Sequence, residues 1–267
     1  MAVDDTRDNG CLGSVVLMRA IARALREVVR AARFRAWAAR LRFELWRQGG
    51  RLEIEAPHGV HFDSAPNIRA FPSGNGDGLL RLRIGRDVRL GRNMTIEVFA
   101  QGNNELAIGD GARFLANVRI TLRSGTLLLG SDCLVRDGAW IKVDGTLSVG
   151  NGVTVGPYSA VHCADQITLD DLVGLGERVS LIDSDHTFDG SDIHYMLKPI
   201  STSPVHLQRQ TMVAMGSVVL RGALIGPNSV VAANSVVRGG NYLKGSLLAG
   251  NPAKVLKILS PEGPEVC

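Results

Sequence analysis

The sequence predicts an all-β fold in which the chain winds into a parallel β-helix of triangular coils. Five apolar residues stand six apart without interruption, and four small residues follow them at the same spacing. A step of six keeps side chains on one side of a strand but scatters them around an α-helix. One strand of 25 residues would be abnormally long, so we expect a corner every six residues. The repeat consists of Val213, Val219, Ile225, Val231 and Val237, with Ser217, Ala223, Ser229 and Ser235.

The same repeat extends towards the N-terminus with small insertions. Three six-residue steps make one coil of about 18 residues. A β-sandwich also has short, regularly spaced strands, but it does not hold a fixed six-residue register. The expected inward triplets are Ile84, Leu90 and Ile96; Ile108, Phe114 and Ile120; Leu129, Val135 and Ile141; Val149, Val155 and Val161; and Leu169, Leu175 and Leu181.

Before the repeat, residues 14–50 are predicted to form a basic amphipathic helix, preceded by a disordered N-terminus at residues 1–13. Apolar residues recur there at alternating steps of four and three, which is a heptad spacing. Between Ser14 and Gln48 nine Arg and two Glu give a net charge of +7, which leaves the rest of the chain at −3. The heptad positions are Met18, Ala22, Leu25, Val29, Ala32, Ala36, Ala39, Phe43 and Trp46.

Two interpretations of this helix are open. An apolar seam flanked by arginines suits the surface of an anionic membrane, which gives an expected peripheral contact through residues 14–48. The same pattern suits packing on the solenoid or on a neighbouring subunit. Nucleic acid is not an expected partner, because the rest of the chain is net acidic and carries no zinc-finger or RNP-like motif.

Residues 51–83 are expected to form irregular cap coils. Short alternating apolar segments are separated there by Pro57, Pro66 and Pro72. The exposed end of a solenoid has to be closed, and irregular coils can do this.

The composition indicates the compartment. Four cysteines lie far apart without CxxC spacing, which argues against a disulfide framework or a zinc knuckle. No apolar run is long enough to span a bilayer, and the first residues lack a signal-peptide pattern. We therefore expect a cytoplasmic protein, with peripheral contact at the inner face of the membrane if the helix binds lipid.

The solenoid itself is expected over residues 84–250, followed by a C-terminal tail at residues 251–267. Its largest interruption is a polar excursion loop at residues 183–204. A loop of this length in a tightly wound domain usually has a function. The loop contains His186, and a neutral imidazole can accept a hydroxyl proton near pH 7.

The C-terminal coils resemble a known family in two segments, Leu220-Arg221-Gly222-Ala223-Leu224-Ile225-Gly226 and Ala249-Gly250-Asn251-Pro252-Ala253-Lys254-Val255. These segments are similar to the hexapeptide-repeat acyltransferases, and most of all to the branch with galactoside, maltose and exopolysaccharide O-acetyltransferases. The resemblance covers residues 84–257. It implies a left-handed parallel β-helix, a handedness that the spacing alone does not show.

The resemblance implies a CoA-dependent O-acetyltransferase that acts on a sugar hydroxyl of a polysaccharide or glycolipid precursor. Acetyl-CoA would be the co-substrate, and neither a metal nor a covalent acyl-enzyme would take part. His186 matches the family's catalytic histidine, which acts as general base. Asp183 and Asp185 lie close enough in sequence to orient its ring or to stabilise the imidazolium.

Other site residues follow from the register or from the resemblance. His162 lies one residue past an inward position and could line the acceptor pocket, together with Asp165 and with His194 of the excursion. The resemblance places acyl-CoA in a groove between neighbouring prisms near the C-terminal coils, and thus implies a homotrimer. The implied donor contacts are Met215, Ala233, Arg238, Gly239, Lys254 and Lys257.

Several alternatives stay open at this point. The same fold could acylate an amino group of a nucleotide sugar or a hydroxyl of an antibiotic. A γ-type carbonic anhydrase would need three zinc-binding histidines across a subunit interface, and the closely spaced pair that it requires is absent. A scaffold that only forms trimers is the remaining non-enzymatic alternative.

Overall fold

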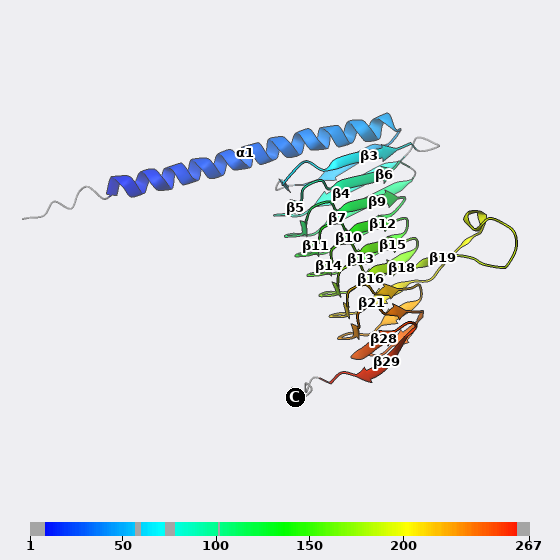
Figure 1. The fold of residues 1–267 in the computed structure, drawn as a ribbon. Coiled ribbons are helices and arrows are strands. Elements are labelled where there is room, and N and C mark those ends of the chain that lie inside the picture. Colours follow the sequence, from blue (N-terminus) through cyan, green and yellow to red (C-terminus); the bar gives the residue numbers. More distant parts are fainter. Residues whose placement is uncertain (1–8, 57–59, 73–77, 101, 261–267) are drawn as a thin grey trace, which may run out of the picture.

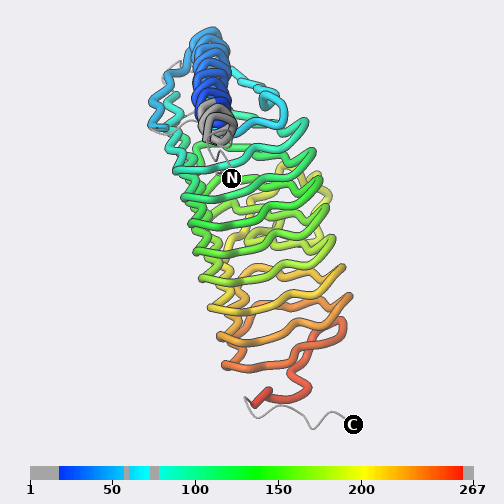
Figure 2. Tube along the Cα trace, turned by 90° about the vertical axis from the view of Figure 1, so that its left-hand side faces the viewer, coloured from blue at the N-terminus to red at the C-terminus, as the bar shows by residue number. Residues whose placement is uncertain are grey.

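A computed structural model describes residues 9–56, 60–72, 78–100 and 102–260, with residues 9–17 described by their backbone alone. It confirms the all-β solenoid. Three parallel sheets form the faces of a long prism, and one helix lies across the N-terminal end (Figure 1). Figure 2 shows the coils stacked in chain order from that end to the other. None of the described helices is both long and apolar enough to cross a membrane.

The three faces are called sheets A, B and C, and each coil between Arg51 and Val237 contributes one strand to each of them. Sheet A contains β1 (Arg51–Glu55), β4 (Leu79–Ile84), β7 (Asn103–Ile108), β10 (Thr126–Leu129), β13 (Thr146–Val149), β16 (Gln166–Leu169), β21 (Val205–Leu207), β24 (Ala223–Ile225) and β27 (Gly240–Tyr242). Sheet B contains β2 (His61–Phe62), β5 (Arg89–Leu90), β8 (Arg113–Phe114), β11 (Leu134–Val135), β14 (Thr154–Val155), β17 (Gly174–Leu175), β22 (Met212–Val213), β25 (Val230–Val231), β28 (Ser246–Gly250) and β29 (Ala253–Ile258). Sheet C contains β3 (Asn67–Phe71), β6 (Thr95–Phe99), β9 (Arg119–Arg123), β12 (Trp140–Val143), β15 (Ala160–Cys163), β18 (Ser180–Ile182), β23 (Val218–Val219) and β26 (Val236–Val237).

The six-residue repeat sets the register between coils. Equivalent positions pair directly, as Ile141 does with Val161 in sheet C. Each predicted inward residue therefore stacks on its counterparts along the prism axis, and none of them is more than 7% exposed. Burial of this continuous apolar column is the main stabilising contribution to the fold.

The corners between sheets depend on residues that tolerate left-handed backbone. Asp87, Asn93 and Asn234 have φ values of 54°, 55° and 56° at equivalent corner positions. Asp and Asn adopt this conformation more readily than most residues. Gly91 has another role, because a Cβ there would lie 2.3 Å from the Leu115 carbonyl oxygen of the next coil. Glycine after an inward residue thus allows adjacent coils to approach closely.

The N-terminal coil is more regular than the predicted irregular cap of residues 51–83. Strands β1, β2 and β3 pair in parallel with β4, β5 and β6 and continue all three sheets. This coil needs no irregular closure, because the helix packs over its end. The predicted break at Pro57 lies outside the described residues.

The helix is α1 (Asn9–Arg47), and its bounds differ from the predicted 14–50. It includes residues 9–13 of the predicted disordered terminus, because each residue added to an existing helix gains a hydrogen bond without a new nucleation cost. Residues 1–8 lie outside the described part. The helix ends before Gly49, whose φ of 81° is left-handed, and Gly50 N–H donates to the Leu45 carbonyl. Glycine is the usual residue at such a helix end.

The predicted C-terminal tail at residues 251–267 contains a strand. β29 pairs antiparallel with β28, with Lys257 beside Leu247 and Lys254 beside Ala249. The pairing covers the backbone of β28, which would otherwise be an exposed edge. Residues 261–267 lie outside the described part.

Candidate functional site

The regular winding is interrupted at one corner between sheets C and A, directly after β18. A short antiparallel pair, β19 (Ser184–His186) and β20 (Ile200–Thr202), extends from that corner, with a 3-10 turn, η1 (Tyr195–Leu197), in the connecting segment. Figure 1 shows this excursion projecting from the side of the prism. The predicted interruption at residues 183–204 therefore forms a hairpin with two defined strands.

His186 ends β19 and pairs with Ile200 of β20. Its ring is half-buried, and the edge of the ring packs against Tyr195 with centroids 5.6 Å apart. Its Nδ1 atom is buried and has no hydrogen-bond partner within the described part of the chain. A buried imidazole nitrogen without a partner is costly unless a further group binds it. The described part of the chain thus holds the His186 ring in place and gives its Nδ1 no hydrogen-bond partner.

Neither predicted acidic neighbour orients this ring. Asp183 is fully buried, and its carboxylate accepts hydrogen bonds from the backbone N–H groups of Ala164, Asp165 and Gln166 at 2.8, 2.9 and 2.8 Å. The Asp185 carboxylate accepts from Arg221 Nε at 2.8 Å. Both carboxylates therefore hold the base of the excursion onto the solenoid, and their expected contact with His186 is not seen.

Asp165 lies at the same base. Its Oδ2 atom accepts a hydrogen bond from the Thr202 hydroxyl at 3.1 Å, which joins the preceding coil to β20. His194 lies further out in the excursion, where its ring stacks on Tyr195 at 4.8 Å and its Nδ1 accepts from the Met196 N–H. Tyr195 therefore lies between the rings of His194 and His186, a contact that the sequence did not indicate.

The excursion is less polar than the sequence predicted. Its large apolar side chains are between 51% and 81% exposed. Such a concentration of exposed apolar side chains marks a contact surface. They are Phe188, Ile193, Tyr195, Met196, Leu197 and Ile200.

His162 points outward from sheet C, one coil before the excursion. Its ring meets the Trp140 ring edge-on at 4.8 Å, and its Nε2 atom is buried without a partner among the described residues. Burial, reinforced by the positive charge of Lys142, lowers the pKa of His162. The ring is therefore neutral at pH 7, with one nitrogen able to accept a hydrogen bond.

A hydrogen-bonded network continues from Trp140 across the outer face of sheet C. The Trp140 Nε1 donates to the Thr121 hydroxyl at 3.1 Å, and that hydroxyl donates to Glu97 at 2.9 Å. Arg119 forms two hydrogen bonds to the same carboxylate, at 2.8 and 2.7 Å, and its guanidinium lies 5.1 Å from the centre of the Trp140 ring. Trp140 is thereby fixed beside His162, although its position in the repeat gave no sign of a functional role.

Glu97 is only 2% exposed. Burial alone would raise its pKa, but the hydrogen bonds from Arg119 and Thr121 and the nearby positive charges outweigh this effect and lower the pKa below its usual value. A lowered folded-state pKa stabilises the protein above the unfolded pKa, and this contribution is lost as the pH falls through the folded pKa. The network is therefore intact at neutral pH.

The predicted donor residues lie on three different parts of the C-terminal coils. Met215 and Ala233 lie at corners between sheets B and C, whereas Arg238 and Gly239 follow β26 at the corner between sheets C and A. Lys254 and Lys257 are on β29. A Cβ at Gly239 would lie 2.8 Å from the carbonyl oxygen of Arg221, the residue that binds Asp185. Arg221, which the sequence reasoning missed, thus connects the excursion to one part of the donor set.

Among the described residues, no three His, Cys, Asp or Glu side chains are grouped as a metal site would require. The structure joins His162, Asp165, Asp183 and the base of the excursion into one cluster. It does not place Met215 or Ala233 at the corner that carries the excursion.

No protein family model matches the chain, and no curated protein matches its sequence significantly. Among solved structures, a variant of AntD, an N-acyltransferase from Bacillus cereus in complex with dTDP-4-amino-4,6-dideoxyglucose and coenzyme A, is 18% identical over 57% of this chain and 82% of its own, with a TM-score of 0.48. AntD with dTDP and 3-hydroxybutyryl-CoA is 17% identical over 57% and 81%, with a TM-score of 0.49. The polySia-specific acetyltransferase NeuO is 16% identical over 77% and 86%, with a TM-score of 0.34. Similarity at this level is no argument for the reaction or the substrate of this chain.

Proposed function

We propose that the protein is a CoA-dependent O-acetyltransferase that transfers the acetyl group of acetyl-CoA to a sugar hydroxyl of a polysaccharide or glycolipid precursor. The observation that carries this proposal is His186. The main excursion from an otherwise regular solenoid holds an imidazole with a buried nitrogen that lacks a partner within the described chain. The segments Leu220–Gly226 and Ala249–Val255, which resemble hexapeptide-repeat acyltransferases, add support.

In the proposed reaction, His186 acts as the general base. Its neutral imidazole takes the proton of the sugar hydroxyl while the hydroxyl oxygen forms a bond to the thioester carbonyl carbon. The C–S bond then breaks, and the imidazolium returns the proton to the departing CoA thiolate. The products are an acetyl ester and CoA–SH. A backbone N–H of an adjoining subunit would stabilise the intermediate oxyanion.

The acceptor would bind beside the excursion. His162 offers a neutral nitrogen there, and Trp140 offers a fixed aromatic ring. Asp165 and His194 lie at the base and along the outer part of the excursion. These groups suit a sugar, which presents several hydroxyls for hydrogen bonding and apolar C–H faces for an aromatic ring.

The donor would bind along the C-terminal coils. Arg238, Lys254 and Lys257 supply positive charge for phosphates. Small or flexible side chains at Met215, Ala233 and Gly239 leave room for the pantetheine arm. Because these positions lie at two corners and on β29, a groove between two prisms would use one corner from each subunit.

We also propose that the protein is a homotrimer, with the apolar side chains of the excursion covered by a neighbouring subunit. Six large apolar side chains exposed on one hairpin are unusual for a monomer. Sedimentation equilibrium of the intact protein is expected to give three times the chain mass of 28.6 kDa. A concentration-independent monomer would contradict the trimer.

The test of the proposed reaction is release of free CoA thiol from acetyl-CoA with a panel of sugars and oligosaccharides. We expect turnover that requires an acceptor, and a product whose acetyl group is removed by mild alkali, as expected of an ester. An alkali-resistant amide on an amino-sugar nucleotide would replace O-transfer with N-transfer. No acceptor-dependent release with either class would contradict the proposal. In the same assay, Lys254→Ala/Lys257→Ala should raise the KM for acetyl-CoA about tenfold and leave kcat nearly unchanged.

A further inference from the structure

Helix α1 packs on the solenoid through only one of its faces. An aromatic cluster joins the helix to the first coil. It consists of Phe34 and Trp37 of the helix and Phe62 of the coil, with ring centroids 5.6 to 6.3 Å apart. Leu41 and Leu45 continue this face and are at most 1% exposed. The docked face lies on the C-terminal part of the helix, and the N-terminal part extends beyond the prism (Figure 1).

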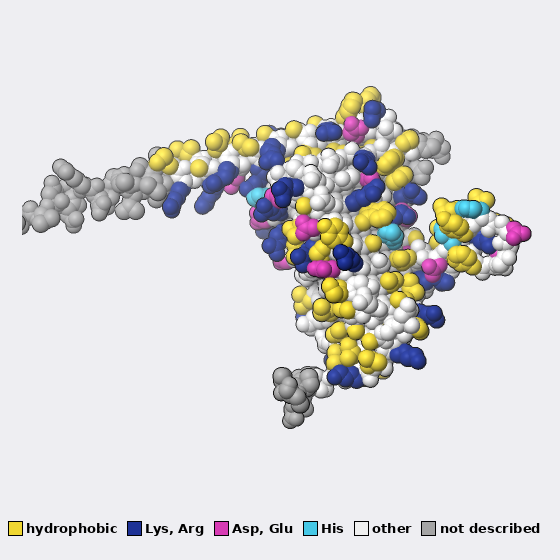
Figure 3. Space-filling view, in the orientation of Figure 1, with side chains coloured by type: hydrophobic (Ala, Val, Ile, Leu, Met, Phe, Trp, Pro, Cys, Tyr) yellow, Lys and Arg dark blue, Asp and Glu magenta, His cyan; other side chains and the backbone are white. Residues whose placement is uncertain are grey.

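The opposite face of α1 is apolar and uncovered. Figure 3 shows hydrophobic side chains along the edge of the helix that faces away from the coils, and Lys and Arg side chains along the edge nearer to them. The exposed apolar side chains are each between 49% and 69% exposed, and five of them belong to the heptad seam, which would be buried if the seam docked on the prism. They are Met18, Ile21, Leu25, Val28, Val29, Phe43 and Trp46, of which Leu25 and Val29 also border the cleft between the helix and the first coil.

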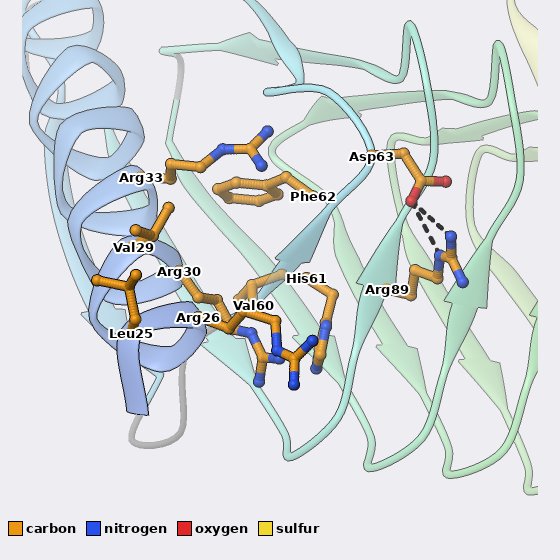
Figure 4. Close-up of a pocket in the computed structure, with 10 residues that line it drawn as sticks. All are labelled: Leu25, Arg26, Val29, Arg30, Arg33, Val60, His61, Phe62, Asp63 and Arg89. Carbon is orange, nitrogen blue, oxygen red and sulfur yellow. Dashed lines mark hydrogen bonds and ion pairs between the residues drawn. The ribbon is translucent and has the colours of Figure 1, made fainter. Parts of the chain in front are cut away.

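Arginines line a cleft between α1 and the first coil. The cleft has a volume of about 470 Å³, and Arg26, Arg30 and Arg33 border it from the helix (Figure 4). The acidic side chain in its lining, Asp63, is bound by Arg89 at 2.7 Å. No ion pair joins these three helix arginines to a carboxylate in the described part of the chain. Burial, together with the positive charges of Arg30 and Arg89, lowers the pKa of His61 in the same cleft.

The direction of the apolar face restricts what can cover it. The face points away from the coils, so a second prism lying alongside the first would place its own helix beside α1 and not over this face (Figures 1 and 3). A flat layer beyond the end of the prism can cover the whole face at once. The arginines on the other side of the helix lie close enough to such a layer for electrostatic attraction, and they favour an anionic surface.

We propose that α1 lies in the surface of an anionic phospholipid bilayer, with its outward apolar face among the acyl chains and with Arg26, Arg30 and Arg33, on its polar side, attracting the lipid phosphates. Trp46 and Phe43, whose rings are 6.0 Å apart, would lie at the interface, where aromatic side chains are favoured. The prism would then project from the membrane end-on. This inference goes beyond the proposed acetyl transfer and does not depend on it.

Flotation of the full-length protein with two kinds of vesicle tests the inference. One vesicle is pure phosphatidylcholine and the other contains 30% phosphatidylglycerol. We expect at least tenfold tighter binding to the anionic vesicles, weakened by salt. We also expect vesicles to shield Trp46 from acrylamide, whereas Trp37, which is 3% exposed, is shielded already.

Two variants separate the apolar and the electrostatic contributions. Ile21→Glu/Val28→Glu, on the outward face, should lower binding to both vesicles at least tenfold. Arg26→Gln/Arg30→Gln/Arg33→Gln should lower binding to the anionic vesicles alone and reduce the salt dependence. The matched control is Arg113→Gln/Arg136→Gln/Arg178→Gln, which removes the same charge from exposed solenoid positions and should bind as the parent does.

Two results would overturn the inference. The first is an equal loss of binding in the control and in the helix variants, which would show that only net charge matters. The second is unchanged vesicle binding by Ile21→Glu/Val28→Glu together with a lower mass in sedimentation, which would assign the apolar face to a second copy of the chain. Circular dichroism of every variant shows whether the helix and the solenoid remain folded.

Discussion

Replacement of His186 by Ala is expected to lower kcat by about 10²- to 10⁴-fold, the usual contribution of a general base. The KM for acetyl-CoA should change little, because the proposed donor contacts lie on the C-terminal coils and not in the excursion. His186→Asn should be as inactive as the Ala variant, since an amide can fill the space but cannot take a proton. Initial rates of CoA release at saturating donor and acceptor provide the measurement.

His206 provides a matched control for this prediction. It is half-buried like His186, but it lies on sheet A of the solenoid, where its Nε2 is 2.9 Å from Asp170 Oδ1. His206→Ala should leave kcat within a few-fold of the parent. Full activity of His186→Ala would rule out His186 as the base, and an equal loss in both variants would point to a general loss of folding.

The solenoid could be predicted because its signal is local and repeated. Val213 through Val237 are six apart, and an even step with tight corners allows one way to bury all of them. Every coil carries the same pattern, so an error in the prediction of one coil does not affect the prediction of the others. The prediction failed at the N-terminal coil, where the prolines of residues 51–83 suggested irregularity. Packing of Trp37 and Leu41 over that coil decides its conformation, and this contact is distant in sequence.

The packing of the helix and the contacts of the excursion were harder to predict for a related reason. Two apolar stripes run along α1, and sequence alone does not tell which one docks. The predicted heptad stripe from Met18 to Trp46 is largely exposed, whereas Phe34, Trp37, Leu41 and Leu45 form the docked face. The acidic residues near His186 presented the same difficulty. Their spacing is compatible with contact to the ring, but the cross-coil backbone N–H groups that bind Asp183 have no signature in the sequence.

The two proposals lead to a common geometry. Sheet A has five strand spacings between β1 and β16, which is the sheet A strand of the coil that ends in the excursion. At about 4.8 Å for each spacing, the excursion lies roughly 24 Å from the coil that carries α1. An enzyme held to a bilayer by α1 would therefore act on sugars well above the lipid headgroups. That position suits an extended glycan on a lipid carrier better than a sugar attached directly to the lipid.

Replacement of Asp183 by Ala is expected to destabilise the protein by about 3–5 kcal/mol, although Asp183 takes no part in the proposed proton transfer. Its buried carboxylate accepts three backbone N–H groups from the corner at residues 164–166, and its own carbonyl accepts from the Ser203 N–H at 2.9 Å. Without the carboxylate, three buried donors lose a charged acceptor at once. Asp183→Asn should lower the free energy of unfolding by nearly as much, because the amide NH₂ would face other donors.

Asp185→Asn is the control for this effect, since its carboxylate is half-exposed and pairs with a single partially exposed Arg221. We expect this substitution to lower the free energy of unfolding by less than about 1 kcal/mol. Urea unfolding at pH 7 provides both values from shifts of the midpoint at constant slope. The Cys163 thiol gives a second readout, because burial and the adjacent Asp183 charge raise its pKa to about 12. Asp183→Ala should lower that pKa, whereas Asp185→Asn should leave it unchanged. Equal stability of the two variants would mean that Asp183 does not anchor the excursion, and a role at His186 would then have to be reconsidered.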